Sequence, residues 1–393
     1  MNASLIRLFT FALLATFPLG VLLRYKVATN IYVVPQDIFA IAIFLLIIID
    51  HFALKKRNID SIFIFQVIFV LVGLSSLAIN SLLHNDIRVI PAVSYALRYL
   101  VYSSLINVSA YFNNSKTIKF FVFGSGICFV VFSFVQYYFF NSLRPLMFLG
   151  WDEHLYRIFS TFLDPNFAAV FLVFFSFLLI PKVFKGRLTE SYRSVLLFYF
   201  TQLALFMTYS RTGLVALISG FFSYSIITRK LKLFFVVTLL IVVSLFIFSD
   251  TKVEGLNPFR TVSSSERITS MLHALEIVKE NPIIGVGFNA YRDVQIREGV
   301  RNLAGANISN ADAGTDNSIL FVLATTGILG FTFFTASYAI LLRRLHKENT
   351  QISRVLLSAT VGLLFGSLFL NVLFYTPILS FVLIVISVRK NLL

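Results

Sequence analysis

The sequence predicts an all-α polytopic membrane protein. Hydrophobic residues make up 58% of the 393 positions and charged residues only 13%, whereas soluble domains carry about 25% charged residues. The mean hydropathy is +0.86. Apolar runs recur along the whole chain at about 20 residues, the length that a helix needs to cross a bilayer. We therefore expect a single integral membrane domain over residues 1–393.

Twelve segments are long and apolar enough to be membrane spans. They lie near residues 5–23, 34–50, 60–80, 88–110, 117–140, 166–184, 192–209, 211–228, 232–249, 316–342, 353–371 and 374–388. The first has only Arg7 before its apolar stretch and no small-residue cleavage site after it. We therefore expect a retained span and not a signal peptide.

The distribution of charge predicts the orientation of these spans. With the N-terminus inside, the inner loops hold 19 of the 33 Lys and Arg but only 4 of the 18 Asp and Glu, as expected for cytoplasmic loops. The net charge of +15 thus reflects topology and not a nucleic-acid groove. Both termini should be cytoplasmic. Only two outer segments are long, 141–165 and 250–315, so we expect any chemistry at the outer face.

Cysteine and histidine give no metal pattern. Cys128 is the only cysteine and lies in an apolar stretch, which excludes a disulfide framework and leaves no Cys/His ligand spacing. We expect no metal and no cofactor. Among the histidines on the outer side, His273 in the long loop is the one candidate for a substrate contact.

The loop 250–315, between the ninth and tenth spans, is expected to contain amphipathic helix. Ser263 and Glu266 have the spacing of a capping box, apolar residues then recur at helical spacing over 268–278, and Pro282 ends the run. The helix should be about 15 residues long and lie against the membrane surface. Arg267 falls in its first turn, either as a functional cation or as a solvated charge paired with Glu266 or Glu276.

Two further arginines are placed where charge is costly. Arg211 lies at the outer junction of two consecutive spans, and Arg98 lies roughly ten residues inside its span. Charges at such depth are paired or functional, and a guanidinium beside a helix N-terminus suits a phosphate. Arg211 could instead be an interfacial anchor. Arg98 could contact phosphate or be a buried partner of Asp37.

Asp316, at the outer start of the tenth span, is the carboxylate best placed to accept a proton. The dipole at a helix N-terminus favours its ionised form. The alternative is a simple N-cap, by Asp316 or by Thr315. Asp152, Glu153 and Asp164 are further acids on the same side, and a pair of acids is often used in glycoside chemistry.

Four segments follow one another in a recognisable order. They are residues 157–168 with their Pro-Asn-x-x-Ala element, Ser-Arg-Thr-Gly at 210–213, Arg267 followed by Pro282, Gly285 and Gly287, and Asp316-Asn317 followed after nine residues by Gly327 and Gly330. Together they resemble the O-antigen ligase and O-antigen polymerase superfamily of bacterial polysaccharide assembly. The resemblance covers about residues 140–330, and the first four spans match in hydropathy alone.

The resemblance implies glycosyl transfer at the outer leaflet, from a polyprenyl-diphosphate-linked oligosaccharide to a sugar hydroxyl, without a nucleotide sugar or an obligatory metal. It assigns Arg211 and Arg267 to the diphosphate. The family's catalytic base is a histidine, and Asp316 stands at that position here. Further substrate-binding side chains are expected at Arg98, Arg157, Asn166, Ser210, His273 and Asn317.

Asp-Asn at positions 316 and 317 looks more like the polymerases of polysaccharide repeats than like the ligases. We therefore predict a repeat-unit polymerase in the bacterial plasma (inner) membrane. The alternatives are a ligase that transfers glycan to lipid A core and, more weakly, a transporter for a lipid-linked or anionic solute. Expected partners are the lipid-linked oligosaccharide as donor and acceptor, membrane lipid, a chain-length regulator and a flippase, with no nucleic acid.

Overall fold

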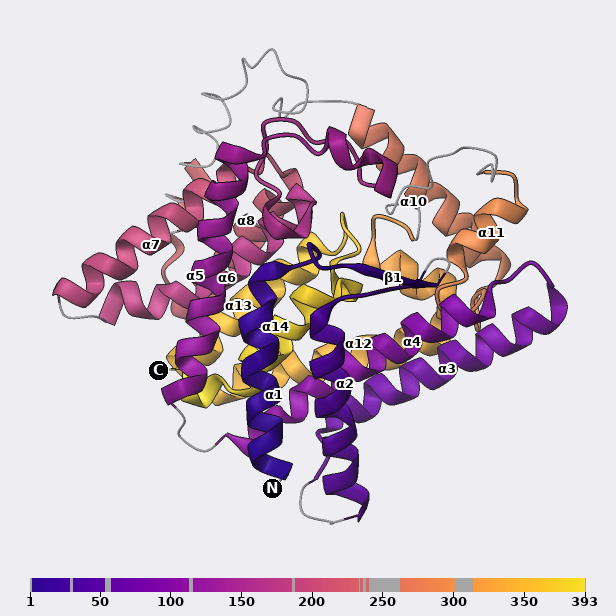
Figure 1. The fold of residues 1–393 in the computed structure, drawn as a ribbon, viewed down its shortest axis with the longest axis horizontal. Helices are drawn as coiled ribbons and strands as arrows, with labels where there is room; N and C mark the ends of the chain where they lie inside the picture. Colours follow the sequence, from indigo (N-terminus) through magenta and orange to yellow (C-terminus); the bar gives the residue numbers. More distant parts are fainter. Residues whose placement is uncertain are drawn as a thin grey trace.

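The computed structural model describes residues 2–28, 31–53, 58–112, 116–185, 188–232, 234–235, 238–239, 262–300 and 314–392. These residues form a bundle of helices with one short β-hairpin (Figure 1). The α-helices are α1 (Asn2–Thr16), α2 (Pro35–Ile48), α3 (Ser61–Leu83), α4 (Val89–Ser103), α5 (Lys116–Phe139), α6 (Pro165–Lys185), α7 (Leu188–Phe206), α8 (Arg211–Thr228), α10 (Val262–Glu280), α11 (Tyr291–Arg297), α12 (Ser318–Glu348), α13 (Gln351–Gly366) and α14 (Thr376–Ser387). Shorter helical segments are η1 (Phe17–Leu19), η2 (Ile49–Ala53), η3 (Ser104–Tyr111), η4 (Arg144–Leu149), η5 (Ser160–Phe162), η8 (Val372–Phe374) and η9 (Arg389–Asn391).

The prediction of an all-α polytopic membrane protein is confirmed. Eight helical segments in the described part of the chain are long and apolar enough to cross a membrane, and α13 and α14 are shorter apolar helices. Eleven of the twelve predicted spans coincide with described helices. The remaining one, 232–249, falls largely outside the described residues.

Ion pairs join residues that the predicted topology puts on the same side. Arg344 pairs with Asp60, and Arg389 with Glu348, all on the side expected to be cytoplasmic. Figure 1 shows both termini toward the same end of the bundle. These contacts agree with the predicted threading, while the side that faces the cytoplasm stays a prediction from the charge distribution.

A β-hairpin between α1 and α2 was not predicted. Strands β1 (Tyr25–Ala28) and β2 (Ile31–Val33) pair antiparallel, with Tyr25 opposite Val33 and Lys26 opposite Tyr32. Aromatic and β-branched residues favour such strands. At three to four residues each, the strands are too short for the alternation of polar and apolar residues to be recognised.

Helix α12 is interrupted at Gly327, whose φ of 60° lies in the left-handed region. Residues 282–287, which follow α10, form backbone hydrogen bonds with α12 on both sides of this interruption. The Val286 N–H donates to Ala324 O (2.9 Å), and the Ile328 N–H donates to Pro282 O (2.9 Å). These bonds satisfy backbone groups that the broken helix cannot pair, as the interior of a membrane protein requires.

Glycine is required on both sides of this contact, and α3 completes it. A Cβ on Gly327 would lie 2.2 Å from Ile283 O, and Gly285 also has a positive φ, of 67°. Ser76 Oγ and Asn80 Nδ2, on α3, both donate to Gly285 O at 3.1 Å. The predicted loop 250–315 therefore includes a segment that lies inside the bundle and fixes the chain after α10 against α3 and α12.

Candidate functional site

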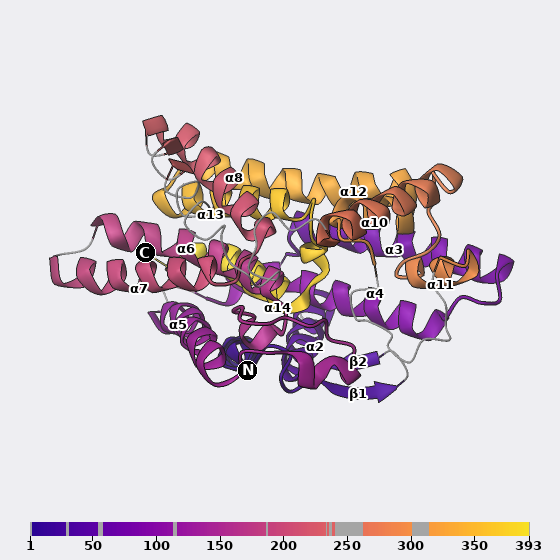
Figure 2. The ribbon, with the colours of Figure 1, turned by 90° about the horizontal axis from the view of Figure 1, so that it is seen from above.

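Arg267, on α10, contacts the beginnings of both α8 and α12. Its Nε atom lies 3.8 Å from Asp316 Oδ2, and its Nη1 atom donates to Thr212 Oγ1 at 3.3 Å. Thr212 follows Arg211, the first residue of α8, and the like charges of Arg211 and Arg267 are close enough to act on each other. The structure thus brings the three predicted catalytic residues together. Figure 2 shows α8, α10 and α12 along one side of the molecule.

The charges of this group are only partly shielded. The Arg267 side chain is 16% exposed and the Asp316 side chain 37% exposed. Among the described side chains, this group combines two guanidinium groups with one carboxylate and therefore has an excess of positive charge. Such an excess attracts an anion.

Asn317, and not Asp316 or Thr315, is the N-cap of α12. Its Oδ1 atom accepts hydrogen bonds from the N–H groups of Ile319 (2.8 Å) and Leu320 (3.0 Å). The alternative that Asp316 caps this helix is therefore not what the structure shows. Asn317, expected as a substrate contact, fixes the helix start directly beside Asp316.

Ser210 and Asn166 join the beginnings of α8 and α6. Ser210 Oγ accepts a hydrogen bond from the Gly213 N–H (3.2 Å) and donates to Asn166 Oδ1 (2.9 Å). Asp164 Oδ1 in turn accepts from the N–H of Asn166 at 2.6 Å. Burial raises the pKa of Asp164 above its ordinary value. Ser210, which directly precedes Arg211, and Asn166 thus form a hydrogen-bonded pair, and their expected contact with substrate stays a prediction.

Arg157 is buried, with 2% of its surface exposed. Its Nε atom donates to Thr208 O at 2.8 Å and its Nη2 atom to Tyr209 O at 3.4 Å. These carbonyls belong to the turn that precedes Ser210 and Arg211. Arg157 therefore holds the backbone that positions Arg211, a role that the sequence did not reveal because it depends on contacts across 51 residues.

Arg98 forms a two-point ion pair with Asp37. Its Nε and Nη2 atoms donate to the two carboxylate oxygens, both at 2.8 Å, and Tyr102 also donates to Asp37 Oδ1 at 2.8 Å. Of the two alternatives for Arg98, the structure shows the buried ion pair.

His273 is on α10, is 7% exposed and faces α11. Its ring faces Tyr291, with centroids 6.1 Å apart, and its Nε2 atom lies 3.4 Å from Glu298 Oε2. Burial raises the pKa of Glu298. The described contacts of His273 are thus within the α10–α11 region, and its predicted contact with substrate stays a prediction.

Helix α10 ends at Glu280, directly before the predicted Asn281-Pro282 stop. Ala274 and Ile277 face the protein interior, whereas Ile268, Leu272 and Leu275 are exposed. An exposed apolar face fits the expected contact with the membrane surface, which stays a prediction. The predicted capping contact between Ser263 and Glu266 lies outside the described side chains.

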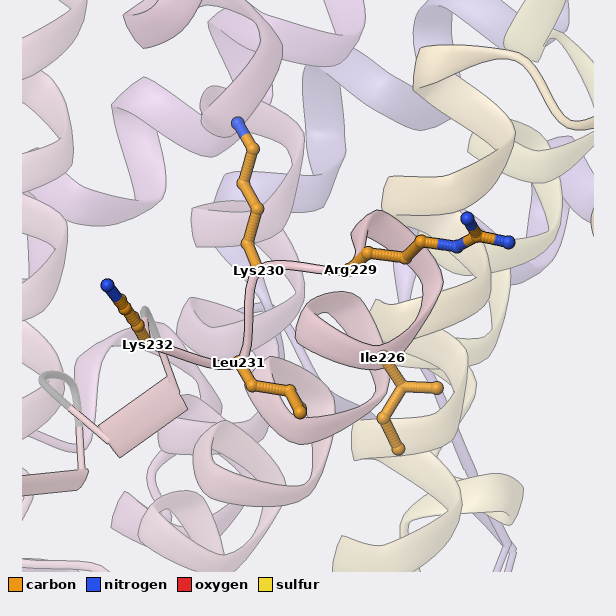
Figure 3. Close-up of a pocket in the computed structure, with 5 residues that line it drawn as sticks. All are labelled: Ile226, Arg229, Lys230, Leu231 and Lys232. Atoms are coloured by element: carbon orange, nitrogen blue, oxygen red, sulfur yellow. The ribbon is translucent and has the colours of Figure 1, made fainter.

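A pocket at the other end of α8 is separate from this group. It is lined by Ile226, Arg229, Lys230, Leu231 and Lys232. Figure 3 shows its three cationic side chains pointing apart, so they do not converge on one anion. The 18 residues of α8 separate this pocket from Arg211 by about 26 Å, at about 1.5 Å per residue. Among the described residues, no group of three or more His, Cys, Asp or Glu is arranged to hold a metal ion.

The region that contains Arg211, Arg267 and Asp316 is also the region that matches a known family. Residues 195–335 match the O-antigen ligase family. The matched range includes the contact between residues 282–287 and the break in α12. The resemblance inferred from the sequence is confirmed over this range. No curated protein matches the chain.

The match to the O-antigen ligase family supports a membrane enzyme that processes O-antigen-type glycans. The apolar helices independently make the chain a multi-pass membrane protein.

Proposed function

We propose that the protein is a polysaccharide polymerase that joins polyprenyl-diphosphate-linked repeat units at the outer face of the bacterial plasma membrane. The donor is the growing chain on its polyprenyl diphosphate, and the acceptor is the non-reducing end of a new lipid-linked unit. The acceptor oxygen bonds to the anomeric carbon while the bond to the diphosphate breaks. The diphosphate leaves with the bonding electron pair, the hydroxyl proton passes to Asp316, and a single displacement inverts the anomeric carbon.

The observation that supports this proposal is the contact of Arg267 with both Thr212 and Asp316. It brings Arg267 to the start of α8, where Arg211 lies, and in the proposed reaction these two cations stabilise the negative charge that grows on the leaving diphosphate. Guanidinium groups match phosphate oxygens in geometry and charge. Donors fixed before the reaction stabilise such charge without reorganisation.

Asp316 suits the role of base because the capping of α12 does not use its carboxylate. Asn317 supplies the cap, and the Asp316 side chain is partly exposed. A carboxylate within reach of the acceptor hydroxyl can take up its proton. The expected partners, a flippase that delivers lipid-linked units and a chain-length regulator, follow from this reaction.

The proposal is tested with Arg211→Ala and Arg267→Ala in a strain that lacks the chromosomal gene. Each variant should abolish the ladder of long surface glycans while the protein remains in the membrane, because loss of one charge-stabilising donor costs about 100- to 1,000-fold in rate. Arg144→Ala is the matched control, since Arg144 is an exposed arginine on the same predicted side. Normal ladders in both variants would refute the assignment of the diphosphate to these arginines.

A ligase is the second candidate, because the matched family is described as O-antigen ligase. Deletion of the gene separates the two. Loss of a polymerase leaves single repeats attached to their carrier or core, whereas loss of a ligase leaves the core bare and long chains on the polyprenyl lipid.

A further inference from the structure

A second group of side chains surrounds Arg24, next to the β-hairpin. The guanidinium carbon of Arg24 lies 3.6 Å from the centroid of the Tyr32 ring and 5.4 Å from that of the Trp151 ring. Tyr32 is on β2, and Trp151 follows η4 in the segment 141–165. All three side chains are half-buried. Two segments far apart in sequence thus place their rings around one cation, as in a cation–π arrangement.

The scaffold around this group is fixed by polar and apolar contacts. Arg98, already paired with Asp37, donates from Nη1 to Tyr32 O at 3.3 Å, which ties β2 to α2 and α4. Trp151 packs with Val21 against a small apolar cluster. The rings are therefore positioned before any ligand arrives, which reduces the entropic cost of binding.

These rings differ from the aromatic residues that anchor a protein at the membrane surface. Interfacial aromatic side chains lie at the headgroup level, and Tyr25 on the neighbouring strand, 73% exposed, fits that description. Tyr32 and Trp151 are instead half-buried and face a guanidinium. Aromatic rings beside a few fixed polar groups are a combination that small-molecule binding sites use.

Tyr375, at the start of α14, connects this group to the candidate catalytic residues. Its ring stacks on Phe167, with centroids 4.1 Å apart, and Phe167 follows Asn166, which holds Ser210. The charges of Arg24, Arg98 and Asp164 all act on Tyr375. Tyr375 therefore lies within electrostatic reach of Arg24 and packs against the start of α6, where Asn166 contacts Ser210.

We propose that Tyr32, Trp151 and Arg24 form a binding subsite for a sugar ring of the lipid-linked oligosaccharide, at a distance from the diphosphate. The C–H face of a pyranose packs on an aromatic ring, and a guanidinium offers several N–H donors to hydroxyl oxygens. This subsite rests on the proposed function for the identity of its ligand. It explains how a repeat unit could be recognised apart from its lipid carrier.

The test uses the fact that Trp151 is the only tryptophan of the chain, so tryptophan fluorescence of the purified protein reports on this position alone. The probe is the free repeat-unit oligosaccharide, without lipid or phosphate, released from the surface glycan of the source strain. It is added up to roughly 10 mM, ten times the Kd of an interaction of about 4 kcal/mol. We expect a saturable change in the emission of Trp151.

Two substitutions at Tyr32 show whether binding of the oligosaccharide depends on the aromatic ring at this position. Tyr32→Ala should weaken binding about tenfold, the factor that corresponds to 1.4 kcal/mol, whereas Tyr32→Phe keeps the ring and should bind as the wild type does. Tyr199→Ala is the control, because Tyr199 is an exposed tyrosine on α7, remote from the hairpin in Figure 1. An unchanged emission in the wild type, or equal titrations for Tyr32→Ala and the wild type, would overturn the subsite.

Arg211→Ala separates this proposal from the proposed function. The variant should lose polymer formation but retain the fluorescence titration with free glycan. Trp151→Ala should raise the KM for lipid-linked substrate about tenfold with little change in kcat. If Arg211→Ala makes normal polymer while the titration succeeds, the diphosphate assignment fails and the sugar subsite stands.

Discussion

The Nε atom of Arg267 lies 3.8 Å from Asp316 Oδ2, although Arg267 is on α10 and Asp316 directly precedes the N-cap of α12, beyond the segment that enters the bundle. The same guanidinium reaches Thr212 at the start of α8. Any displacement of α10 would therefore change the surroundings of both the proposed base and the proposed diphosphate site.

Asp316→Asn should lower the rate of polymer formation by about 100- to 10,000-fold, the usual contribution of a general base. The substitution removes the ability to accept a proton, and it leaves the helix cap intact because Asn317 provides it. The rate is measured with purified protein and lipid-linked repeat units. If the Asp316→Asn variant forms polymer at the wild-type rate, the carboxylate is not the base.

Asn317→Ala should cost about 1 kcal/mol of stability, since the N–H groups of Ile319 and Leu320 lose their acceptor. Asn317→Ser keeps a capping oxygen and should therefore retain most of the stability that Asn317→Ala loses. Thermal unfolding of the purified variants measures the difference. Equal melting temperatures for the Ala and Ser variants would contradict the capping role.

Gly327→Ala should destabilise the protein by several kcal/mol, because its Cβ would meet Ile283 O at 2.2 Å and its φ is 60°. Gly299→Ala is the control. Gly299 has a φ of 70°, and no atom of the described residues lies within 4 Å of the added Cβ, so Gly299→Ala should cost only the backbone strain of about 1–2 kcal/mol. The yield of folded protein in the membrane, compared between the two variants, is the measurement, and equal yields would count against a tight contact at the break in α12.

Arg98→Ala should destabilise the fold by about 3–5 kcal/mol, because it leaves the buried carboxylate of Asp37 without its partner. The double variant that also carries Asp37→Ala should recover part of that loss, since no unpaired charge remains. Melting temperatures and polymer formation are compared. A well-folded double variant without activity would instead indicate that Arg98 contacts the substrate.

Asp164→Asn should stabilise the protein at neutral pH. Burial raises the pKa of Asp164 in the folded state, so the wild type is most stable below the ordinary pKa of the carboxyl and loses stability as the pH rises through the raised value. Asparagine does not titrate and still caps α6. The melting temperature of Asp164→Asn should therefore exceed that of the wild type by more at about pH 7 than at about pH 4. A gain of the same size at both pH values would contradict the effect of burial.

The sequence predicted the helical fold well because its signal is local. Runs of about 20 apolar residues are recognisable one at a time, and helices were found at eleven of the twelve expected spans. The association of Arg211, Arg267 and Asp316 was also expected, but from the resemblance to a family and not from the spacing of the residues.

Long-range contacts could not be predicted in the same way. The roles of Arg157 and Asn317 depend on which backbone groups they meet, and no periodicity encodes those partners. Arg98 shows the same limit, since its sequence position suggested both a phosphate contact and an ion pair with Asp37. The hairpin of β1 and β2 is also defined by distant contacts. Trp151 lies beside Arg24, which directly precedes β1, although the two residues are more than one hundred positions apart in the sequence.

Hydrogen bonds join residues 282–287 to the broken α12 and thereby connect the two parts of the site by contacts other than the covalent chain between them. Arg267 precedes these bonds and Asp316 lies at the start of the helix that receives them. A gene divided between residues 300 and 314 should therefore yield two co-expressed fragments that assemble into one working enzyme.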